Sequence, residues 1–364
     1  MYPVSRLAAV QEATAKAGLD ALLLTPGPDL RYVSGYDAKP LERLTCLVVP
    51  ASGEAYMMVP RLELPAAEAS PASRLGLEFV AWDETDDPYA IAAARLGRPA
   101  RVGLADRMWA MSSLRFRAAL PGTEQVLAGS VLRELRMRKS PAEVAALRQA
   151  GEAIDGVHRQ VPGLLRAGRT EREVARDIAE AILASGHATV DFVIVASGPN
   201  GASPHHDVSD RVIQAGEPVV VDIGGALHNG YCSDSTRTYS VGEPPAEFAA
   251  YYEVLRQAQD AACRAVRPGV SCESIDAAAR DVIAAAGHGD HFVHRTGHGI
   301  GIETHEEPYI VAGNGEPMEP GFAFSVEPGI YLPGRHGARI EDIVVCTDGG
   351  YERLNNTPRE LVVV

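Results

Sequence analysis

Four acidic residues of the C-terminal half stand inside otherwise apolar, strand-like segments: Asp222, Asp234, Glu327 and Glu341. The run PVVVDIG carries Asp222, and after a glycine-containing turn the run YCSDSTRTYSV carries Asp234. A hairpin of this kind can bring two carboxylates close enough to bridge a pair of metal ions. A charged side chain inside an apolar strand is costly unless it is paired or bound to a metal. The four acids therefore indicate a cation site.

Each of these acids also has a structural interpretation. Aspartates beside glycine turns often serve as caps or turn formers, so the pair Asp222 and Asp234 alone leaves both interpretations open. The run FAFSVEPGIY is predicted to be one strand with Glu327 inside it, and ARIEDIVVCT another with Glu341 inside it. Because side chains alternate along a strand, Arg339 shares a face with Glu341 and could form a salt bridge with it. Two buried acids on neighbouring strands favour a functional site.

Histidines supply further ligands and proton carriers. The glycine-rich run HRTGHGIGIETHEEP holds His294, His298 and His305, and the glycines beside His298 allow close approach of the backbone to a ligand. The spacing is not HExxH, which argues against a zincin. The run SPHHDVSD adds His205 and His206, for which a surface position is also open. Three histidines in one loop beside a carboxylate cluster indicate a site.

The ligand types predict the chemistry. Four carboxylates and one imidazole suit hard or borderline divalent ions such as Mn²⁺ or Co²⁺. Two carboxylates can bridge a pair of ions about 3.5–4 Å apart, and such a pair lowers the pKa of a bridging water and polarises a carbonyl group. That chemistry is hydrolysis.

The segments that must position these residues contain an internal repeat. Arg166-Ala-Gly-Arg-Thr170 aligns with Arg267-Pro-Gly-Val-Ser271, and Gly186-His187 aligns with Gly287-His288. Each copy predicts a helix, a glycine turn, a capped second helix, a Gly-His pair and a strand. Thr170 with Glu173 forms a capping box, and Ser271 is the equivalent cap. The repeat predicts two halves related by a pseudo-two-fold axis, forming one sheet with helices on one side and a site in the cleft between them.

The first third of the chain predicts a separate α/β domain, residues 1–125, without a chemistry-bearing cluster. Residues 126–364 form the second domain, which a charged helix from Leu132 to Gly151 leads into. The first domain is predicted to contain a helix over Met1 to Ala17, strands over Leu19 to Thr25, Leu77 to Trp82 and Arg101 to Leu104, and a hairpin of Cys46 to Pro50 with Ala55 to Val59.

Composition limits the class of protein. The chain has 364 residues, of which 46% are hydrophobic, so it can bury the cores of two domains. A net charge of -14 argues against nucleic acid or an anionic membrane as the main partner. Five scattered cysteines without a CxxC pair suit a reducing cytoplasm. The N-terminus shows an amphipathic helix pattern and no secretory signal, and no uncharged run reaches the ~20 apolar residues of a membrane span.

Four segments together resemble the metal-binding segments of the pita-bread metallopeptidases (M24): DIGG…SDSTRT, HRTGHGIGIETHEEP, SVEPGIY and ARIEDIV. Within that family the whole chain is most similar to Xaa-Pro dipeptidases (prolidases) and aminopeptidase P, more weakly over its N-terminal part. The resemblance implies an α/β creatinase-like N-terminal domain and an α+β pita-bread catalytic domain. It also implies hydrolysis of Xaa-Pro peptide bonds, and the preference for proline rests on the resemblance alone.

The resemblance assigns roles to the metal ligands residue by residue. It implies that Asp222, Asp234, His298, Glu327 and Glu341 bind two divalent ions per subunit, expected to be Mn²⁺, with Co²⁺ or Zn²⁺ as alternatives. Asp234 and Glu341 would bridge the two ions. Glu327 would also pass a proton to the leaving nitrogen.

The same resemblance assigns four side chains to the substrate and its surroundings. His205 and His305 would contact the scissile carbonyl and stabilise its developing charge. His294 would line the proline pocket, and Arg339 would hold neighbouring carboxylates in place.

Specificity remains open between two activities. In dipeptidases a loop of the N-terminal domain is expected to close the cleft, and here GYDAKPLERLT would place Arg43 on the substrate carboxylate and Asp37 on the free amine. A solvated loop with a local salt bridge is the other interpretation. An aminopeptidase P acting on longer peptides is the alternative function, and members of the family are expected to be homodimers. The spacing between Asp222 and Asp234 is one residue longer than is common in the family, and the extra residue is expected in the turn at Leu227 to Gly230.

Other classes fit less well. Prolidase-like sites can also cleave phosphotriesters as a side activity. A relative that only binds peptides, or a metal-free creatinase-type hydrolase, would lack metal ligands that this chain retains. Methionine aminopeptidases usually lack the N-terminal domain.

Overall fold

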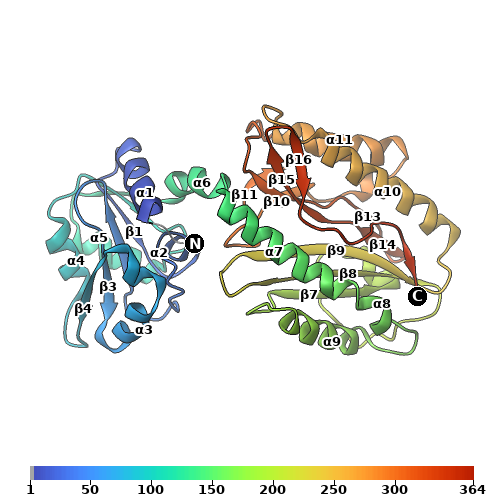
Figure 1. The fold of residues 1–364 in the computed structure, drawn as a ribbon, viewed down its shortest axis with the longest axis horizontal. Coiled ribbons are helices and arrows are strands. Elements are labelled where there is room, and N and C mark those ends of the chain that lie inside the picture. The colour runs from blue at the N-terminus through green and yellow to red at the C-terminus, as the bar shows by residue number, and fades with distance from the viewer. Residues whose placement is uncertain (1–3) are drawn as a thin grey trace. The chain divides into compact units, whose positions relative to one another are not determined.

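The computed structural model describes residues 4–364, so the first three residues of the predicted N-terminal helix lie outside the described part. The chain forms two compact units, one through Arg136 and one from Met137 to Val364, and Figure 1 labels the elements of both. The predicted domain boundary at residue 125 lies before α6 (Gly129–Met137), within the first unit, and stays a prediction.

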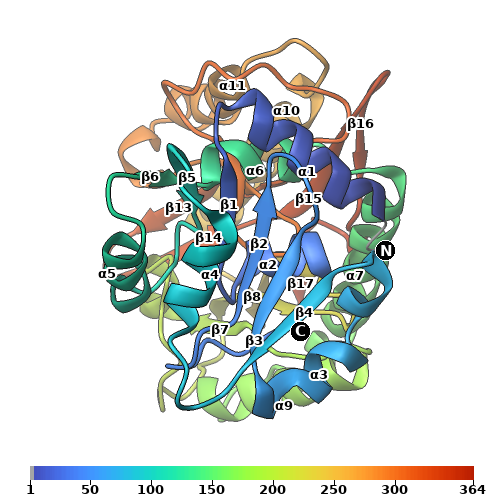
Figure 2. The ribbon, with the colours of Figure 1, turned by 90° about the vertical axis from the view of Figure 1, so that its left-hand side faces the viewer.

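The first unit is built on one six-stranded sheet with the order β4-β3-β2-β1-β5-β6. Strand β1 pairs antiparallel with β2 and parallel with β5, so the sheet is mixed. Figure 2, in which this unit faces the viewer, shows its strands with α1 and α4 beside them. The strands are β1 (Ala21–Leu24), β2 (Cys46–Pro50), β3 (Tyr56–Pro60), β4 (Glu78–Trp82), β5 (Arg101–Leu104) and β6 (Glu124–Leu127). The helices are α1 (Val4–Lys16), α2 (Pro28–Ser34), α3 (Leu64–Ala69), α4 (Pro88–Leu96), α5 (Ala110–Ala119) and α6, with 3₁₀ turns η1 (Arg61–Glu63) and η2 (Pro71–Leu75).

The strand predictions for this unit are confirmed to within a few residues. The predicted hairpin forms, with Cys46 opposite Met58 in the β2–β3 ladder. Strand β6 was not predicted, because its four residues include the exposed Glu124 and Leu127 and show no alternation of buried and exposed side chains.

The prediction of a single charged helix over Leu132 to Gly151 is wrong. Two helices stand there, α6 and α7 (Pro141–His158), and the chain between them is extended. Ser140 and Glu143 form a capping box that starts α7, and Pro141 at the first helical position has no N–H to continue α6. The main-chain N–H of Lys139 instead donates to the carbonyl of Gly321.

The second unit contains helices and three hydrogen-bonded sheets. The sheets have the orders β17-β9-β8-β7, β11-β10-β12-β15-β16 and β13-β14. The strands are β7 (Phe192–Ser197), β8 (Glu217–Ala226), β9 (Cys232–Val241), β10 (Gly297–Gly299), β11 (Glu306–Ile310), β12 (Ala323–Val326), β13 (Gly329–Leu332), β14 (His336–Arg339), β15 (Asp342–Thr347), β16 (Gly350–Arg353) and β17 (Val362–Val363). The helices are α7, α8 (Val161–Leu164), α9 (Glu171–Ala184), α10 (Ala246–Ala265) and α11 (Cys272–Ala285), with 3₁₀ turns η3 (Gly198–Ala202) and η4 (Gly289–His291).

The prediction of one continuous sheet is therefore wrong. Strand β9 meets the C-terminal strands without a β-ladder, through a main-chain bond from Glu341 N to Thr236 O (3.1 Å) and through side chains. The hydroxyl of Thr238 donates to Arg339 O (3.0 Å), and the guanidinium of Arg237 donates to Glu341 O (2.6 Å). These bonds join β9 to the end of β14 and to Glu341, which lies between β14 and β15, at the place where the acidic residues lie.

The repeat is visible in the helices and less so in the strands. The capping box of Thr170 and Glu173 is confirmed at the start of α9. Ser271 occupies the N-cap position of α11, but its hydroxyl bonds to the hydroxyl of Ser274 (2.8 Å) and does not cap the helix. The strand expected after Gly287-His288 is delayed, because η4 intervenes and β10 begins at Gly297.

Two hydrophobic cores stabilise the second unit. The first core lies between α7, α9 and strands β7 to β9, and includes Ile154, Ile178 and Val221. The second core lies between α10, α11 and the C-terminal strands, and includes Leu255 and Phe324. Figure 1 shows the green helices beside β7 to β9 and the orange helices beside β15 and β16.

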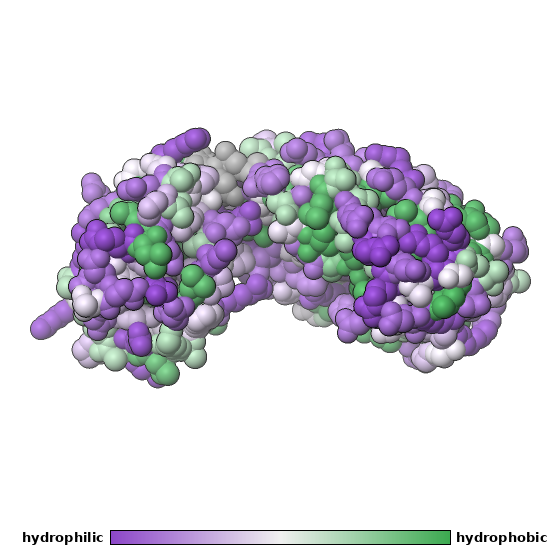
Figure 3. Space-filling view, turned by 90° about the horizontal axis from the view of Figure 1, so that it is seen from below, coloured by the Kyte–Doolittle hydropathy of each residue, from purple (hydrophilic) through white to green (hydrophobic). Residues whose placement is uncertain are grey.

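The face of the molecule in Figure 3 is largely polar. Figure 3 shows hydrophilic residues over most of the face viewed, with smaller hydrophobic areas between them. Every helix within residues 4–364 is too short or too polar to cross a lipid bilayer.

Candidate metal centre and active site

A cavity of about 780 Å³ in the second unit gathers most of the residues singled out from the sequence. It is lined by all four acids and by the three histidines of the glycine-rich run, together with His205 and Arg339. This volume is in the range of small-molecule sites. The residues that line it and were predicted are Asp222, Asp234, His298, Glu327, Glu341, His205, His294, His305 and Arg339.

The hairpin of β8 and β9 positions the two aspartates. Asp222 lies opposite Thr236 and Asp234 lies opposite Gly224 in the antiparallel ladder, so they are near neighbours on adjacent strands. Gly224 has no room for a side chain, because a Cβ there would lie 2.5 Å from the carbonyl oxygen of Ser233. The strand β8 runs to Ala226, two residues beyond the predicted run PVVVDIG, and the hairpin turn follows it.

The two glutamates lie at breaks between strands, so the prediction of uninterrupted strands through them is wrong. Glu327 separates β12 from β13 because Pro328, which follows it, has no N–H for a ladder. The N–H of Glu327 instead donates to Thr296 O (2.8 Å). Glu341 separates β14 from β15, and its N–H turns to Thr236 on β9. Leaving the ladder lets both carboxylates face the cavity.

The acids and histidines form overlapping groups that could hold metal ions. Within each group one donor atom per residue lies within 4.8 Å of the others. His298 Nε2 lies 3.2 Å from Glu327 Oε1 and 3.6 Å from Asp234 Oδ2. The groups are Asp222 with Asp234 and Glu341; His298 with Glu327 and Glu341; and Asp234 with His298 and His305.

Three observations show that these carboxylate and imidazole donors fit divalent cations. Asp222 Oδ1 and Glu341 Oε1 are buried without a hydrogen-bond partner among the described residues, which a cation would supply. Burial and then the neighbouring carboxylates raise the pKa of both Asp234 and Glu341 well above the ordinary value, so positive charge is favoured there. His298 Nδ1 lies 3.1 Å from Gly299 O, which leaves Nε2 as a ligand in the arrangement usual for metal-bound histidine.

Arg339 balances part of this negative charge. Its Nη2 lies 2.5 Å from Asp222 Oδ2, its Nη1 donates to the hydroxyl of Tyr331 (2.8 Å), and its Nε lies 4.0 Å from Glu327 Oε2. The alternative interpretation of a salt bridge between Arg339 and Glu341 is therefore wrong, since the guanidinium faces Asp222. One oxygen of Glu341 instead accepts from the hydroxyl of Thr236 (2.8 Å).

The histidines of the cavity are held differently. The ring of His305 opens to the cavity and lies 4.1 Å from that of His298, and partial burial followed by the nearby His298 lowers its pKa to about 4. His294 Nε2 lies 2.9 Å from the hydroxyl of Tyr331, and burial lowers its pKa. Both are therefore neutral at neutral pH and can donate one N–H. His205 is exposed to the cavity, whereas its neighbour His206 turns away to Glu171 (2.8 Å).

The two loop residues of the first unit are engaged locally. Arg43 Nε lies 2.6 Å from Glu84 and its Nη1 lies 2.7 Å from Glu42. Asp37 lies 3.3 Å from Arg31 and its side chain is 70% exposed. Within their own unit both residues match the interpretation of a solvated loop with local salt bridges.

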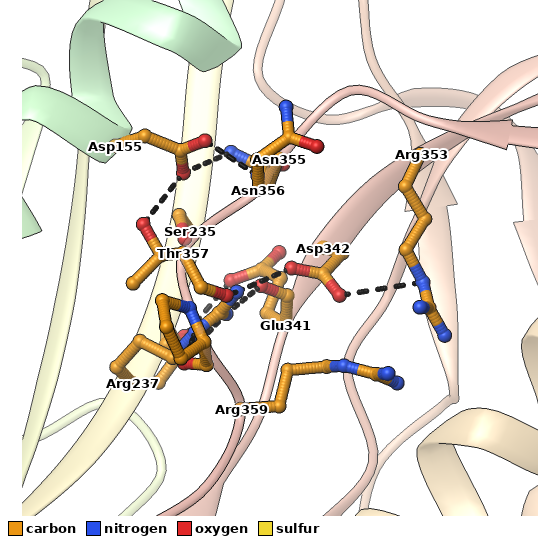
Figure 4. A network of polar contacts seen from close by, with 12 residues as sticks. Asp155, Ser235, Arg237, Glu341, Asp342, Arg353, Asn355, Asn356, Thr357 and Arg359 are labelled. Carbon is orange, nitrogen blue, oxygen red and sulfur yellow. Dashed lines mark hydrogen bonds and ion pairs between the residues drawn. The ribbon is translucent and has the colours of Figure 1, made fainter. Parts of the chain in front are cut away.

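A second polar network lies behind the site and is shown in Figure 4. Asp342, which follows Glu341 and faces away from it, pairs with Arg237 (2.6 Å), and both side chains are buried. Arg237 also donates to the carbonyls of Thr357 and Pro358, so the C-terminal segment is bound to β9. Asp155 on α7 accepts from the N–H of Asn356 and from the hydroxyl of Thr357. The network therefore fixes the backbone on which Glu341 stands.

Some residues of the site were not predicted. Arg295 lines the cavity with its guanidinium stacked 4.3 Å from the ring centre of Tyr309. Its position beside His294 in the glycine-rich run was the signal available for it. Tyr331, which joins His294 to Arg339, lies in the run FAFSVEPGIY and was not singled out from the sequence.

Two family models match the chain. The model described as metallopeptidase family M24 matches residues 145–348. The model described as creatinase/prolidase N-terminal domain matches residues 6–138.

Similar proteins cover the full chain. A Mycobacterium tuberculosis protein named "Probable dipeptidase PepE" is 56% identical over 360 residues, which is 99% of this chain and 96% of that protein. An Xaa-Pro dipeptidase of Lactobacillus delbrueckii subsp. lactis is 34% identical over 358 residues, with 95% of each covered. The crystal structure of dipeptidase PepE from Mycobacterium ulcerans is 57% identical with a TM-score of 0.94, covering 99% of this chain and 97% of that one.

Proposed function

The chain belongs to metallopeptidase family M24, and from this premise we propose that it hydrolyses Xaa-Pro dipeptides with two divalent metal ions. Membership confirms the resemblance drawn from the four motif segments and the class of enzyme. The observation that carries the proposal is the buried convergence of Asp222, Asp234, His298, Glu327 and Glu341 in one cavity.

The proposed ligand roles follow from how the donors overlap. Asp234, Glu341 and His298 each belong to two of the donor groups. Of these three, only the two carboxylates have two oxygens with which to bridge a pair of ions, which supports their role as bridging ligands. Asp222 would complete one position and His298 with Glu327 the other. We propose Mn²⁺ as the cation, with Co²⁺ or Zn²⁺ as alternatives, because oxygen donors predominate. When bound, two such cations activate a water and polarise the scissile carbonyl.

The chain's own residues would carry the proton and stabilise charge. Although burial opposes its ionisation, contacts with His298 hold the pKa of Glu327 below the ordinary value, so its carboxylate can accept a proton. We propose that Glu327 delivers that proton to the leaving proline nitrogen, which has no N–H of its own. His205 and His305 would donate to the carbonyl oxygen as its charge develops. His294 would line the proline pocket, with Tyr331 bonded to its Nε2 from behind.

A dipeptidase also needs a cation for the substrate's terminal carboxylate. Arg295 lines the cavity, and none of the ion pairs within residues 4–364 includes it. Arg43, the partner proposed from the sequence with Asp37 for the amine, is paired with Glu84 and Glu42. We therefore rank Arg295 before Arg43 for this role, since an arginine without an acidic partner loses no ion pair when it binds a carboxylate.

Two further properties belong to the proposal. Homodimers are expected from the family resemblance. A reducing cytoplasm is supported by the five cysteines, which are all free and buried.

The experiment that tests the function compares hydrolysis of Met-Pro, Met-Ala and Met-Pro-Ala by protein stripped with chelator and reloaded with Mn²⁺. Cleavage of Met-Pro alone supports the proposal. Cleavage of Met-Ala as well shows a general dipeptidase, and cleavage of Met-Pro-Ala shows an aminopeptidase P. Absence of metal-dependent cleavage of all three would overturn the proposed activity.

A further inference from the structure

Glu171 is a buried carboxylate that lies outside the cavity and has no role in the chemistry described above. It is the first residue of α9, and its side chain is 0% exposed. It accepts hydrogen bonds from main-chain N–H groups and side chains of four residues: Ser197, Asn200, His206 and Ser209. Burial opposes its ionisation, but these donors hold its pKa below the ordinary value.

The donors lie on both sides of His205 along the chain. Ser197 ends β7 and Asn200 lies in η3, before His205, whereas His206 and Ser209 follow it. Their distances to the carboxylate are short: 2.7 Å from Ser197 Oγ, 2.8 Å from His206 Nε2 and 2.6 Å from Ser209 Oγ. The carboxylate therefore joins the two ends of the segment that carries His205.

The main chain of this segment is also fixed from the cavity side and from the helix. Arg339 Nη1 donates to the carbonyl of Pro204 (3.2 Å), the residue before His205. The N–H groups of Glu171 and Arg172, which have no partner within α9, donate to Arg211 O (3.0 Å) and Ser209 O (3.1 Å). His205 thus lies between a residue bound to Arg339 and a residue bound to Glu171.

The position of His205 depends on its backbone, because no hydrogen bond in the described part of the chain holds its ring. Its side chain is exposed to the cavity, and among the described residues no hydrogen bond to the ring is formed. Its direction is therefore set by the backbone that carries it. A displacement of about 1 Å at a catalytic group can cost about 100-fold in rate.

We infer that Glu171 is a positioning residue for His205, holding the segment of residues 197–209 so that the ring faces the scissile carbonyl. The inference rests on the proposed function for the role of His205. It also assigns His206, left between a surface and a functional position by the sequence, to the support of its neighbour.

The experiment uses Glu171→Gln, which keeps shape and burial but turns one accepting oxygen into an NH₂ group facing donors. Glu173→Gln is the matched control, because Glu173 lies in the same helical turn, is exposed, and has a side chain that bonds only within the capping box. Both substitutions are made in the wild-type chain and in His205→Ala. The kcat and KM for Met-Pro are measured with Mn²⁺, and amide hydrogen exchange of residues 198–209 is measured without substrate.

Glu171→Gln should lower kcat by about 10–100-fold with little change in KM, and should speed exchange in residues 198–209. In the His205→Ala background it should lower kcat no further, within about twofold, because the group it positions is gone. Glu173→Gln should change neither kcat nor exchange. An equal loss in both backgrounds would show a general structural effect and overturn the inference, as would unchanged exchange and kcat.

Further variants and the exchange measurement test the inference if the main comparison fails. If Glu171→Gln does not fold, His206→Leu and Ser209→Ala each remove one side-chain donor and should give the same pattern at smaller size. If the wild type cleaves none of the peptides, the proposed function fails. The exchange comparison then still decides whether Glu171 orders the segment.

Discussion

Arg339 and Asp222, 117 positions apart in the chain, form a buried ion pair with 2.5 Å between Nη2 and Oδ2. Only one oxygen of Asp222 is used in this way, and the other has no hydrogen-bond partner among the described residues. The pair therefore fixes the direction of the carboxylate while leaving one oxygen for a ligand.

Removing the cation from this pair should destabilise the protein and weaken metal binding. In chelator-treated protein, Arg339→Met should lower the free energy of unfolding by about 3–5 kcal/mol, because it leaves a buried charge unpaired. Metal affinity should fall about 10–100-fold, since Asp222 loses its orienting partner. Urea unfolding and calorimetric titration with Mn²⁺ measure the two effects. Arg335→Met is the control, because Arg335 pairs with Glu247 on the surface and should leave both quantities nearly unchanged.

Neutralising Glu341 should separate folding from metal binding. Glu341→Gln removes a carboxylate whose pKa is raised by burial and by neighbouring acids, so the metal-free variant should be at least as stable as the metal-free wild type. At an ion concentration 100 times the Kd, bound metal should raise the free energy of unfolding of the wild type by about 2.7 kcal/mol. The same ion concentration should raise that of the variant far less. Thermal unfolding with and without Mn²⁺ gives both comparisons. A wild-type metal response in the variant would contradict the ligand assignment.

The two arginines that could bind the substrate carboxylate, Arg295 and Arg43, can be distinguished with a substrate whose carboxylate is replaced by an amide. Arg295→Met should raise KM for Met-Pro about 10–100-fold, the loss of one charge-assisted hydrogen bond, and leave KM for the amide of Met-Pro unchanged. Arg43→Met should leave both unchanged. The reverse pattern would assign the carboxylate to Arg43 and the loop of the first unit.

Acid should weaken the fold partly through His158. This histidine is buried beside Tyr239, with Nε2 3.1 Å from Ser235 O, and burial followed by the nearby Arg237 lowers its pKa from 6.5 to about 3. Between these two values the unfolded chain binds a proton that the folded protein does not. Stability from this group is therefore complete above pH 6.5 and falls by about 1.4 kcal/mol per unit as the pH drops toward 3.

The measurement is urea unfolding at pH 7.5, 6.0 and 5.0 for wild type and His158→Asn. The variant should be less stable at pH 7.5, yet its stability should fall less steeply with acid. Equal slopes for the two proteins would mean that His158 is protonated in the folded state.

The sequence predicted the metal-centre candidates better than the strands that carry them. An acidic residue or a histidine in an apolar, glycine-rich segment can be recognised even when the predicted bounds of the strand are off by a residue or two. Asp222, Asp234 and His298 could therefore be singled out without coordinates. Glu327 and Glu341 were placed in continuous strands because alternation alone does not show that Pro328 ends a ladder. Glu171 could not be found, since its meaning depends on donors up to 38 residues away that meet it only in the folded chain.

The division of donors between the two hydrophobic cores has a mechanical consequence. Asp222 and Asp234 stand on strands of the first core, whereas Glu327 and Glu341 border strands of the second. A cation shared by these residues would be a cross-link between the cores and would close loops of roughly a hundred residues. A cross-link of this kind would lower the conformational entropy of the unfolded chain, as a disulfide does in the chain-entropy model. The proposed metal centre would thus also join the two halves of its own domain.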